Sequence, residues 1–181
     1  DSDNARLDVE LLLAHSISQT RTWLYTWPDH IPSAVERNLY LELLRRRQSG
    51  EPIAYLVRKQ AFWNLELNIT PDVLIPRPET ELLVEKTLEK LAGIKQARVV
   101  DLGTGSGAIA LALANDNPNW EISGSDSSNE ALDVARNNAE FLDISNVSFQ
   151  AGDWLAPFPE SRFHAIVSNP PYIETGDAHL D

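Results

Sequence analysis

Short strand-like segments alternate with helical segments between residues 98 and 168, and this alternation constrains the fold more than any other feature. The expected strands cover residues 98–102, 121–125, 147–151 and 163–168, and the expected helices cover residues 108–115 and 127–142. Strands joined by helices of this length form parallel sheets through right-handed crossovers. The sequence therefore predicts an α/β fold with a Rossmann-like parallel sheet in this part of the chain.

The residues before this sheet divide into two further parts. Residues 5–50 have helical periodicity, with a capping-box pattern at Ser33 and Glu36 and a stop at Gly50. An aromatic turn is expected at residues 23–28, where it either packs in a core or docks a partner. Apolar alternation at residues 65–69 and an apolar run at 73–75, on either side of a Pro-Asp turn, predict a hairpin.

A predicted amphipathic helix at residues 79–92 then leads into the sheet. We therefore expect a helical domain at residues 1–50, a linker β-hairpin at 51–78 and the sheet domain at 79–181.

Composition limits the kinds of site and partner. The chain has 181 residues, no cysteine and four scattered histidines, so neither a disulfide nor a metal site is expected. No apolar run reaches the roughly 18–20 residues that a membrane span requires, and no leader opens the chain, so we expect a cytoplasmic protein without a membrane partner. A net charge of −12 weighs against a nucleic-acid partner, and the basic run at residues 45–47 suits the solvated end of a helix.

A glycine-rich turn follows the first expected strand and opens a helix. It runs from Asp101 to Gly107 and reads Asp-Leu-Gly-Thr-Gly-Ser-Gly. It lacks the Lys-Ser/Thr ending of a phosphate-binding P-loop and the longer glycine spacing of a dinucleotide fingerprint. The turn therefore favours a smaller cofactor, such as an amino acid joined to adenosine, and the alternative is an ordinary tight turn. The candidate cofactor-binding residues here are Gly103, Thr104, Gly105, Ser106 and Gly107.

Acidic residues stand at or after the ends of the next two strands. Asp126 can accept both ribose hydroxyls of a nucleoside, although an aspartate before a helix is also a common cap. Asp153 can accept from an adenine amine and Trp154 can cover a ring edge; otherwise the two are a loop acid and a packing aromatic residue. All three are candidate cofactor ligands.

The segment Asn169-Pro170-Pro171-Tyr172 after the last strand carries the most specific signal. Its two prolines remove two backbone donors and stiffen the chain, which leaves their carbonyl groups free to accept hydrogen bonds. The Asn169 amide oxygen, the Pro170 carbonyl and the flat face of Tyr172 together suit a planar –NH2 group. These three are the candidate catalytic residues, Asn169 is also a candidate cofactor ligand, and all four residues are candidate substrate-binding residues.

These motifs resemble those of class I methyltransferases that act on amino groups. Leu74–Glu81 (Leu-Ile-Pro-Arg-Pro-Glu-Thr-Glu) and Gly50–Tyr55 (Gly-Glu-Pro-Ile-Ala-Tyr) extend the resemblance, over nearly the whole chain, to the HemK/PrmC family of release factor glutamine methyltransferases. The resemblance implies S-adenosyl-L-methionine as cofactor and the glutamine of the Gly-Gly-Gln motif of a peptide chain release factor as substrate. It also implies substrate docking by the N-terminal helical domain, and it brings Arg77, Glu79 and Thr80 near the active site.

Two features depart from the family pattern. The family commonly has glycine at the position of Arg58, where a positive φ would cost arginine roughly 1 kcal/mol or more. The family sheet has seven strands, of which four are visible, and the chain contains no methionine and stops nine residues after Tyr172. We therefore expect the sequence to be part of a longer protein whose C-terminal strands are missing here.

Two other functions compete with this one. An adenine-amine DNA or RNA methyltransferase would use the same Asn-Pro-Pro-Tyr chemistry on a flipped base, but the net charge and the lack of an obvious basic recognition segment weigh against it. A non-catalytic adaptor would keep the helical domain as a binding module on a vestigial methyltransferase fold, and the intact motifs argue against that.

Overall fold

A computed structural model describes residues 4–170 of the chain. The chain forms two compact units, Asp1–Lys59 and Gln60–Asp181. Within residues 4–170, none of the helices has the length and apolar character needed to cross a lipid bilayer. The first unit is helical, and its core is formed by Leu12, Leu43 and Leu56. Its elements are α1 (Ala5–Ser16), α2 (Arg21–Thr26), α3 (Ala34–Gln48) and α4 (Ile53–Val57).

The start of α3 confirms one sequence prediction and the position of α2 corrects another. Glu36 Oε2 accepts from the Ser33 N–H at 2.7 Å and Ser33 Oγ accepts from the Glu36 N–H at 3.3 Å, so the predicted capping box is present. The predicted aromatic turn is wrong for residues 23–26, which belong to α2. Thr20 Oγ1 accepts from the Trp23 N–H at 3.2 Å, and this cap starts a short helix that the aromatic composition concealed.

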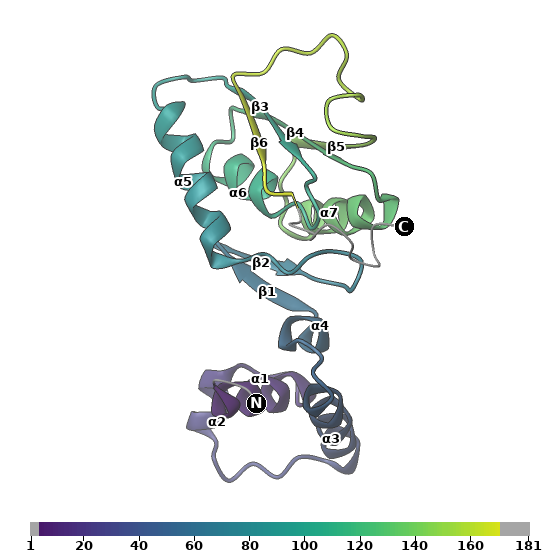
Figure 1. The fold of residues 1–181 in the computed structure, drawn as a ribbon. Coiled ribbons are helices and arrows are strands. Elements are labelled where there is room, and N and C mark those ends of the chain that lie inside the picture. The colour runs from purple at the N-terminus through teal and green to yellow at the C-terminus, as the bar shows by residue number, and fades with distance from the viewer. Residues whose placement is uncertain (1–3, 171–181) are drawn as a thin grey trace. The chain divides into compact units, whose positions relative to one another are not determined.

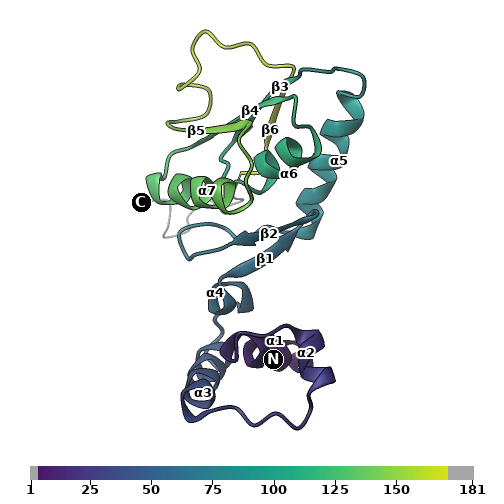
Figure 2. The ribbon, with the colours of Figure 1, turned by 180° about the vertical axis from the view of Figure 1, so that it is seen from behind.

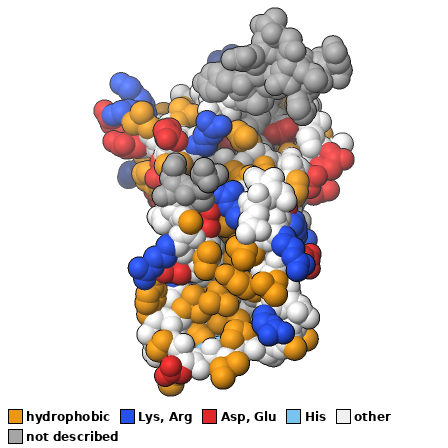
Figure 3. Space-filling model, turned by 60° about the horizontal axis from the view of Figure 1, so that its bottom comes forward, with side chains coloured by type: hydrophobic (Ala, Val, Ile, Leu, Met, Phe, Trp, Pro, Cys, Tyr) orange, Lys and Arg blue, Asp and Glu red, His pale blue; other side chains and the backbone are white. Residues whose placement is uncertain are grey.

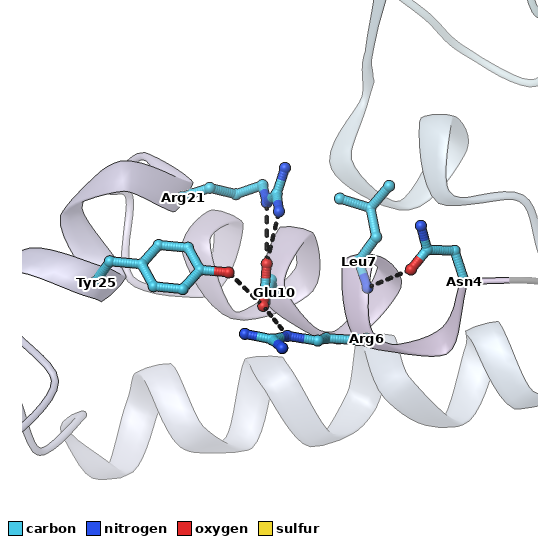
Figure 4. Close-up of polar contacts among 6 residues, drawn as sticks. All are labelled: Asn4, Arg6, Leu7, Glu10, Arg21 and Tyr25. Carbon is cyan, nitrogen blue, oxygen red and sulfur yellow. Dashed lines mark hydrogen bonds and ion pairs between the residues drawn. The ribbon is translucent and has the colours of Figure 1, made fainter.

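A single carboxylate joins α1 to α2. Glu10 accepts hydrogen bonds from Tyr25 Oη at 2.7 Å, Arg21 Nη2 at 2.7 Å and Arg6 Nε at 2.9 Å (Figure 4). Arg6 lies one turn away in α1, whereas Arg21 and Tyr25 belong to α2. The hydrogen bond from Tyr25, followed by those from the two arginines, lowers the pKa of Glu10 to about 2.

This cluster predicts a loss of stability in acid. Because the pKa of Glu10 is lower in the folded state than its ordinary 4.5, the carboxylate stabilises the fold fully above pH 4.5 and loses this effect as the pH falls toward about 2. We expect the difference in unfolding midpoint between wild type and Glu10→Gln, followed by circular dichroism, to shrink across this range. A difference in unfolding midpoint that does not change with pH would contradict the lowered pKa of Glu10.

Arg58 ends α4 in the left-handed region, with φ 57° and ψ 29°. A side chain in this conformation costs about 1–2 kcal/mol relative to glycine. The positive φ therefore gives a physical reason for the glycine that the family commonly has at this position.

Replacing Arg58 by glycine should stabilise the first unit. The relief of strain is partly offset by about 0.4–1 kcal/mol, because glycine adds freedom to the unfolded chain, which leaves a gain of about 0.5–1 kcal/mol in the free energy of unfolding. Urea unfolding measures this gain. The matched control is Lys59→Gly, since Lys59 has no positive φ and its replacement by glycine relieves no backbone strain. An equal loss of stability in both variants would show that Arg58 is not strained.

The second unit contains a hairpin and a parallel sheet (Figures 1 and 2). The hairpin pairs β1 (Lys59–Phe62) with β2 (Leu65–Asn68). The sheet has the order β5-β4-β3-β6, and all its neighbouring strands are parallel. Its strands are β3 (Arg98–Leu102), β4 (Glu121–Asp126), β5 (Val147–Ala151) and β6 (Ala165–Ser168). The helical elements are η1 (Pro78–Thr80), α5 (Glu81–Lys90), α6 (Ala108–Asp116) and α7 (Asn129–Phe141). The predicted α/β fold is confirmed.

Helices α5, α6 and α7 lie along one face of the sheet (Figure 2). Every residue of α6 from Ala108 to Ala114 is buried, so this helix forms the centre of the core against the strands. The register sets Leu102 beside Ser125 on one side and beside Ser168 on the other. The C-terminal ends of the strands therefore share one edge, and the motifs singled out from the sequence follow this edge.

Two local predictions in the second unit are wrong. The hairpin turns at Trp63 and Asn64, and Val73 to Ile75 form no strand. Trp63 adopts a positive φ of 57°, a conformation that a bulky residue rarely adopts and that the sequence therefore does not predict. The N-cap of α7 is Ser128, whose Oγ accepts from the Ala131 N–H at 3.0 Å, and not the expected Ser127.

Candidate functional site

The glycine turn (residues 103–107) is fastened to the end of β4 by backbone hydrogen bonds. The N–H groups of Gly103 and Thr104 donate to the Ser125 carbonyl at 2.8 and 2.9 Å. The Gly105 N–H donates to Asp126 Oδ2 at 2.9 Å. Asp126 therefore holds the turn through one oxygen, and its Oδ1 accepts from the Ser128 N–H at 3.0 Å. Both oxygens keep lone pairs for a ligand.

A buried carboxyl group supports the same turn from within the sheet. Thr104 Oγ1 donates to Asp101 Oδ2 at 2.7 Å. Asp101 is 1% exposed, and its Oδ1 has no hydrogen-bond partner among the described residues. Burial raises the pKa of Asp101 to about 6. The side chain of Thr104 is thus used for structure, and the turn presents backbone rather than this hydroxyl.

A cleft of about 340 Å³ lies beside the glycine turn. Seven residues predicted from the sequence line it: Gly103, Gly105, Asp126, Asp153, Trp154, Asn169 and Pro170. Thr104 and Ser106 are buried and line a smaller adjoining cavity of about 60 Å³, and Gly107 lines neither. The predicted Pro171 and Tyr172 lie outside the described residues.

The charged groups that line the cleft are all acidic. They are Asp72, Asp126 and Asp153, and no lysine or arginine among residues 4–170 joins them. Three carboxylates disfavour a phosphate-bearing ligand and suit a cationic one, and they can accept hydrogen bonds from hydroxyl and amine groups. The lining thus fits a sulfonium nucleoside better than a nucleotide.

Trp154 adds an aromatic side chain to the cleft. The residue is 60% exposed, and its backbone carbonyl accepts a hydrogen bond from Ser125 Oγ at 2.8 Å.

Asn169 lies where this cleft meets a second and larger one. The second cleft measures about 720 Å³ and shares Leu74, Asn169 and Pro170 with the first. Thr80, from η1, lines the second cleft, and its Oγ1 accepts from Asn169 Nδ2 at 2.9 Å. Two molecules bound in the two clefts would therefore come together at Asn169 and Pro170. The second cleft is lined by Leu74, Arg77, Glu79, Thr80, Leu82, Leu83, Lys86, Ser168, Asn169 and Pro170.

Several residues of the first cleft were not predicted from the sequence. They are Asp72, Val73, Leu74, Leu102, Ser127, Ser128, Ala131 and Gly152. Ser127 and Ser128 directly follow Asp126, and this proximity was the available signal. Residues 72–74 gave no such signal, because they were expected to belong to a hairpin.

Family models and relatives from other organisms match the chain. The model "Methyltransferase small domain" matches residues 78–181, and "PrmC N-terminal domain" matches residues 1–57. The release factor glutamine methyltransferase of Coxiella burnetii is 45% identical over 179 residues, covering 99% of this chain and 65% of that protein. That of Burkholderia pseudomallei is 49% identical over 180 residues, covering 96% and 63%. The chain therefore spans slightly less than two thirds of the length of these relatives.

A solved methyltransferase structure shares the fold of about two thirds of this chain. The 16S rRNA N2 G1207 methyltransferase of T. thermophilus, in complex with AdoMet and guanosine, is 26% identical with a TM-score of 0.54, covering 65% of this chain and 33% of that one. One family model matches more than half of the chain, the other matches its N-terminal part, and both curated relatives align with nearly all of this chain. The chain belongs to the HemK/PrmC family of release factor glutamine methyltransferases.

Proposed function

We propose that the protein containing this chain transfers the methyl group of S-adenosyl-L-methionine to the side-chain amide nitrogen of the glutamine in the Gly-Gly-Gln motif of peptide chain release factors. The observation that carries this proposal is that Asn169 and Pro170 line both the acidic cleft and the larger cleft beside it. A methyl donor in the first and a protein segment in the second would meet at the two groups suited to an amide. The reaction would take place in the cytoplasm, with the release factor as partner.

The acidic cleft would hold the cofactor. Asp126 would accept from the ribose hydroxyls, Asp153 from the adenine amine, and Trp154 would cover the adenine ring. Gly103 and Gly105 would let the amino-acid end approach the backbone closely. The bound cofactor supplies an electrophilic methyl group, and the residues of the cleft orient it toward Asn169.

Asn169 is suited to accept from the substrate amide. Because its Nδ2 donates to Thr80 Oγ1, its Oδ1 is the atom left for a ligand. Oδ1 and the Pro170 carbonyl would accept the two amide N–H bonds and favour the positive charge that develops on the nitrogen. The cofactor would supply the methyl group to the nitrogen and keep the sulfur electron pair, and the nitrogen would release one proton to water. No strong base is needed before attack, because the nitrogen becomes acidic as the bond forms; placement in line supplies much of the remaining rate.

The first unit would help to dock the release factor. It exposes large hydrophobic side chains on α2, on the following loop and on α3, which is unusual for a surface without a partner. Figure 3 shows hydrophobic side chains gathered over a broad area of the face turned to the viewer. Among the described residues of the first unit, the most exposed large hydrophobic side chains are those of Tyr25, Trp27, Ile31 and Val35. We place the docking surface at these four residues.

Charge supports a protein substrate over a nucleic acid. Residues 60–181 contain 19 aspartates and glutamates against 7 lysines and arginines, so the whole net charge of −12 falls on the part of the chain that holds the clefts. This charge would repel a phosphate backbone. The likeness to the 16S rRNA N2 G1207 methyltransferase supports an exocyclic or amide –NH2 group as the acceptor that this fold can place.

Transfer of a tritiated methyl group tests the proposal against both alternatives. The whole protein would be incubated with labelled cofactor and either a release factor or adenine-containing DNA. We expect label in the release factor and none in DNA. Label in DNA would overturn the proposal in favour of the adenine-amine reaction, and stable binding of the release factor without transfer would overturn it in favour of an adaptor.

A further inference from the structure

The side chain of Asn138, in α7, is fully buried and bonds to two separate backbone segments. Its Nδ2 donates to the Asn68 carbonyl at 3.0 Å and to the Ser106 carbonyl at 3.0 Å. Its Oδ1 accepts from the Asn68 N–H at 2.7 Å. Both amide hydrogens and the amide oxygen are therefore used, and the side chain bonds Asn68 as a neighbouring strand would.

The two segments lead to two different parts of the lining of the acidic cleft. Ser106 belongs to the glycine turn, whose Gly103 and Gly105 line one wall. Asn68 ends β2, and the chain reaches the lining residues Asp72 to Leu74 only four residues later.

The connection between Asn68 and the second wall is short and internally bonded. The Val73 N–H donates to the Thr70 carbonyl at 3.2 Å, and Thr70 Oγ1 donates to Asp72 Oδ2 at 2.8 Å. Ile69 and Val73 are buried. A displacement at Asn68 would therefore pass to the wall rather than be absorbed by a loose loop.

We infer that Asn138 is a positioning residue that fixes the Asp72–Leu74 wall against the glycine turn and so sets the width of the cofactor cleft. Loss of the Asn138 side chain would remove the hydrogen-bond partner of the Asn68 N–H and of the Asn68 and Ser106 carbonyl groups, which is costly in the protein interior. This inference names a new determinant of cofactor binding and rests on the proposed function for the identity of the ligand. No contact between Asn138 and the cofactor is required.

Asn146 offers a matched control. Its Nδ2 also bonds backbone carbonyls, those of Ala114, Asn117 and Trp120, each at 3.1 Å. These lie at and just after the C-terminal end of α6, and none of them lines the acidic cleft. Asn138→Ala and Asn146→Ala thus remove the same chemical group from similar partners, but only the first joins the cleft walls.

The test measures the dissociation constant for S-adenosyl-L-methionine by calorimetry, and amide hydrogen exchange without cofactor, in the whole protein. We expect Asn138→Ala to weaken binding at least about tenfold and to speed exchange in residues 69–74, whereas Asn146→Ala should change affinity less than about threefold. Equal affinity in Asn138→Ala and wild type, or equal weakening in both variants, would overturn the inference.

Wild-type exchange keeps the inference testable if Asn138→Ala fails to fold. S-adenosylhomocysteine should slow exchange of the Asn68 N–H more than that of the Ile122 N–H, which donates to the Asn146 carbonyl. Equal slowing would contradict the coupling. If wild-type protein binds neither ligand, the proposed cofactor is wrong. Faster exchange at residues 69–74 in cofactor-free Asn138→Ala but not in Asn146→Ala would still support the positioning role of Asn138, and the absence of such a difference would refute it.

Discussion

Replacing Asn169 by alanine should lower kcat for methyl transfer by about 10²–10³-fold while leaving the affinity for S-adenosyl-L-methionine within about tenfold of wild type. The alanine side chain removes the oxygen proposed to accept from the substrate amide. It leaves Asp126, Asp153 and the glycine turn, which carry most of the proposed cofactor contacts. Steady-state kinetics with a release factor, together with calorimetry for the cofactor, separates the two effects.

The neighbouring Ser168 provides the control for this variant. Ser168 also lines the second cleft, but its Oγ donates to the Leu102 carbonyl at 2.7 Å, so Ser168→Ala removes a hydrogen bond from the same strand end and leaves Asn169 Oδ1 and the Pro170 carbonyl in place. We expect kcat of Ser168→Ala within a few-fold of wild type. Turnover of Asn169→Ala at the wild-type rate would remove Asn169 from the mechanism.

Replacing Gly107 by alanine should destabilise the second unit by about 2–4 kcal/mol. Gly107 has φ +81°, where a side chain is strained. An added Cβ would also stand 3.0 Å from Leu111 Cδ1, 3.2 Å from Ala135 Cβ and 3.3 Å from Phe149 Cζ. Leu111 and Ala135 are fully buried and cannot move aside without cost. Urea unfolding followed by tryptophan fluorescence measures the loss.

Gly105 distinguishes packing at the turn from ligand binding. It also has a positive φ, +55°, but a Cβ placed there meets no atom within 4 Å and projects where the cleft is open. Gly105→Ala should therefore cost only about 1 kcal/mol of stability and should weaken cofactor binding. If Gly107→Ala were no less stable than Gly105→Ala, close packing at Gly107 would not be the reason for its glycine.

The architecture of the sheet could be predicted because its signal is periodic and repeated. Three strands were placed within one residue of their observed bounds, and α6 was placed within one residue, since buried strands and an apolar helix leave strong patterns. The last strand begins at Ala165 rather than at residue 163. Phe163 continues the apolar pattern, and the His164 N–H donates to the Arg98 carbonyl at 2.7 Å just before the strand begins.

The local errors arose where tertiary contacts override sequence patterns. Val73 to Ile75 form a continuous apolar run and were expected to form a strand. They lie instead in a loop, where Val73 and Leu74 line the cleft. The hairpin instead turns at Trp63, whose N–H donates to Glu81 Oε1 at 2.8 Å and whose Nε1 donates to Asp116 Oδ2 at 2.8 Å. These partners lie 18 and 53 residues away, so no local pattern could have indicated the turn.

The candidate site was predicted as far as its residues sit in recognisable motifs. Asp126, Asn169 and the exposed glycines end strands or follow them, and topology alone brings such positions together. Asn138 is different, because a polar residue in an amphipathic helix is normally assigned to its exposed face. Its role depends on Asn68, 70 residues earlier, and only the structure brings the two together.

The central claim is that the glutamine side-chain nitrogen receives the methyl group, and tandem mass spectrometry of the Gly-Gly-Gln peptide tests it most directly. The peptide would be recovered from a release factor incubated with the whole protein and S-adenosyl-L-methionine. We predict one added methyl group on the glutamine side chain, and none after incubation with Asn169→Ala. A methyl group on any other residue, or an unmodified peptide although the wild-type protein binds the cofactor, would contradict the proposed function.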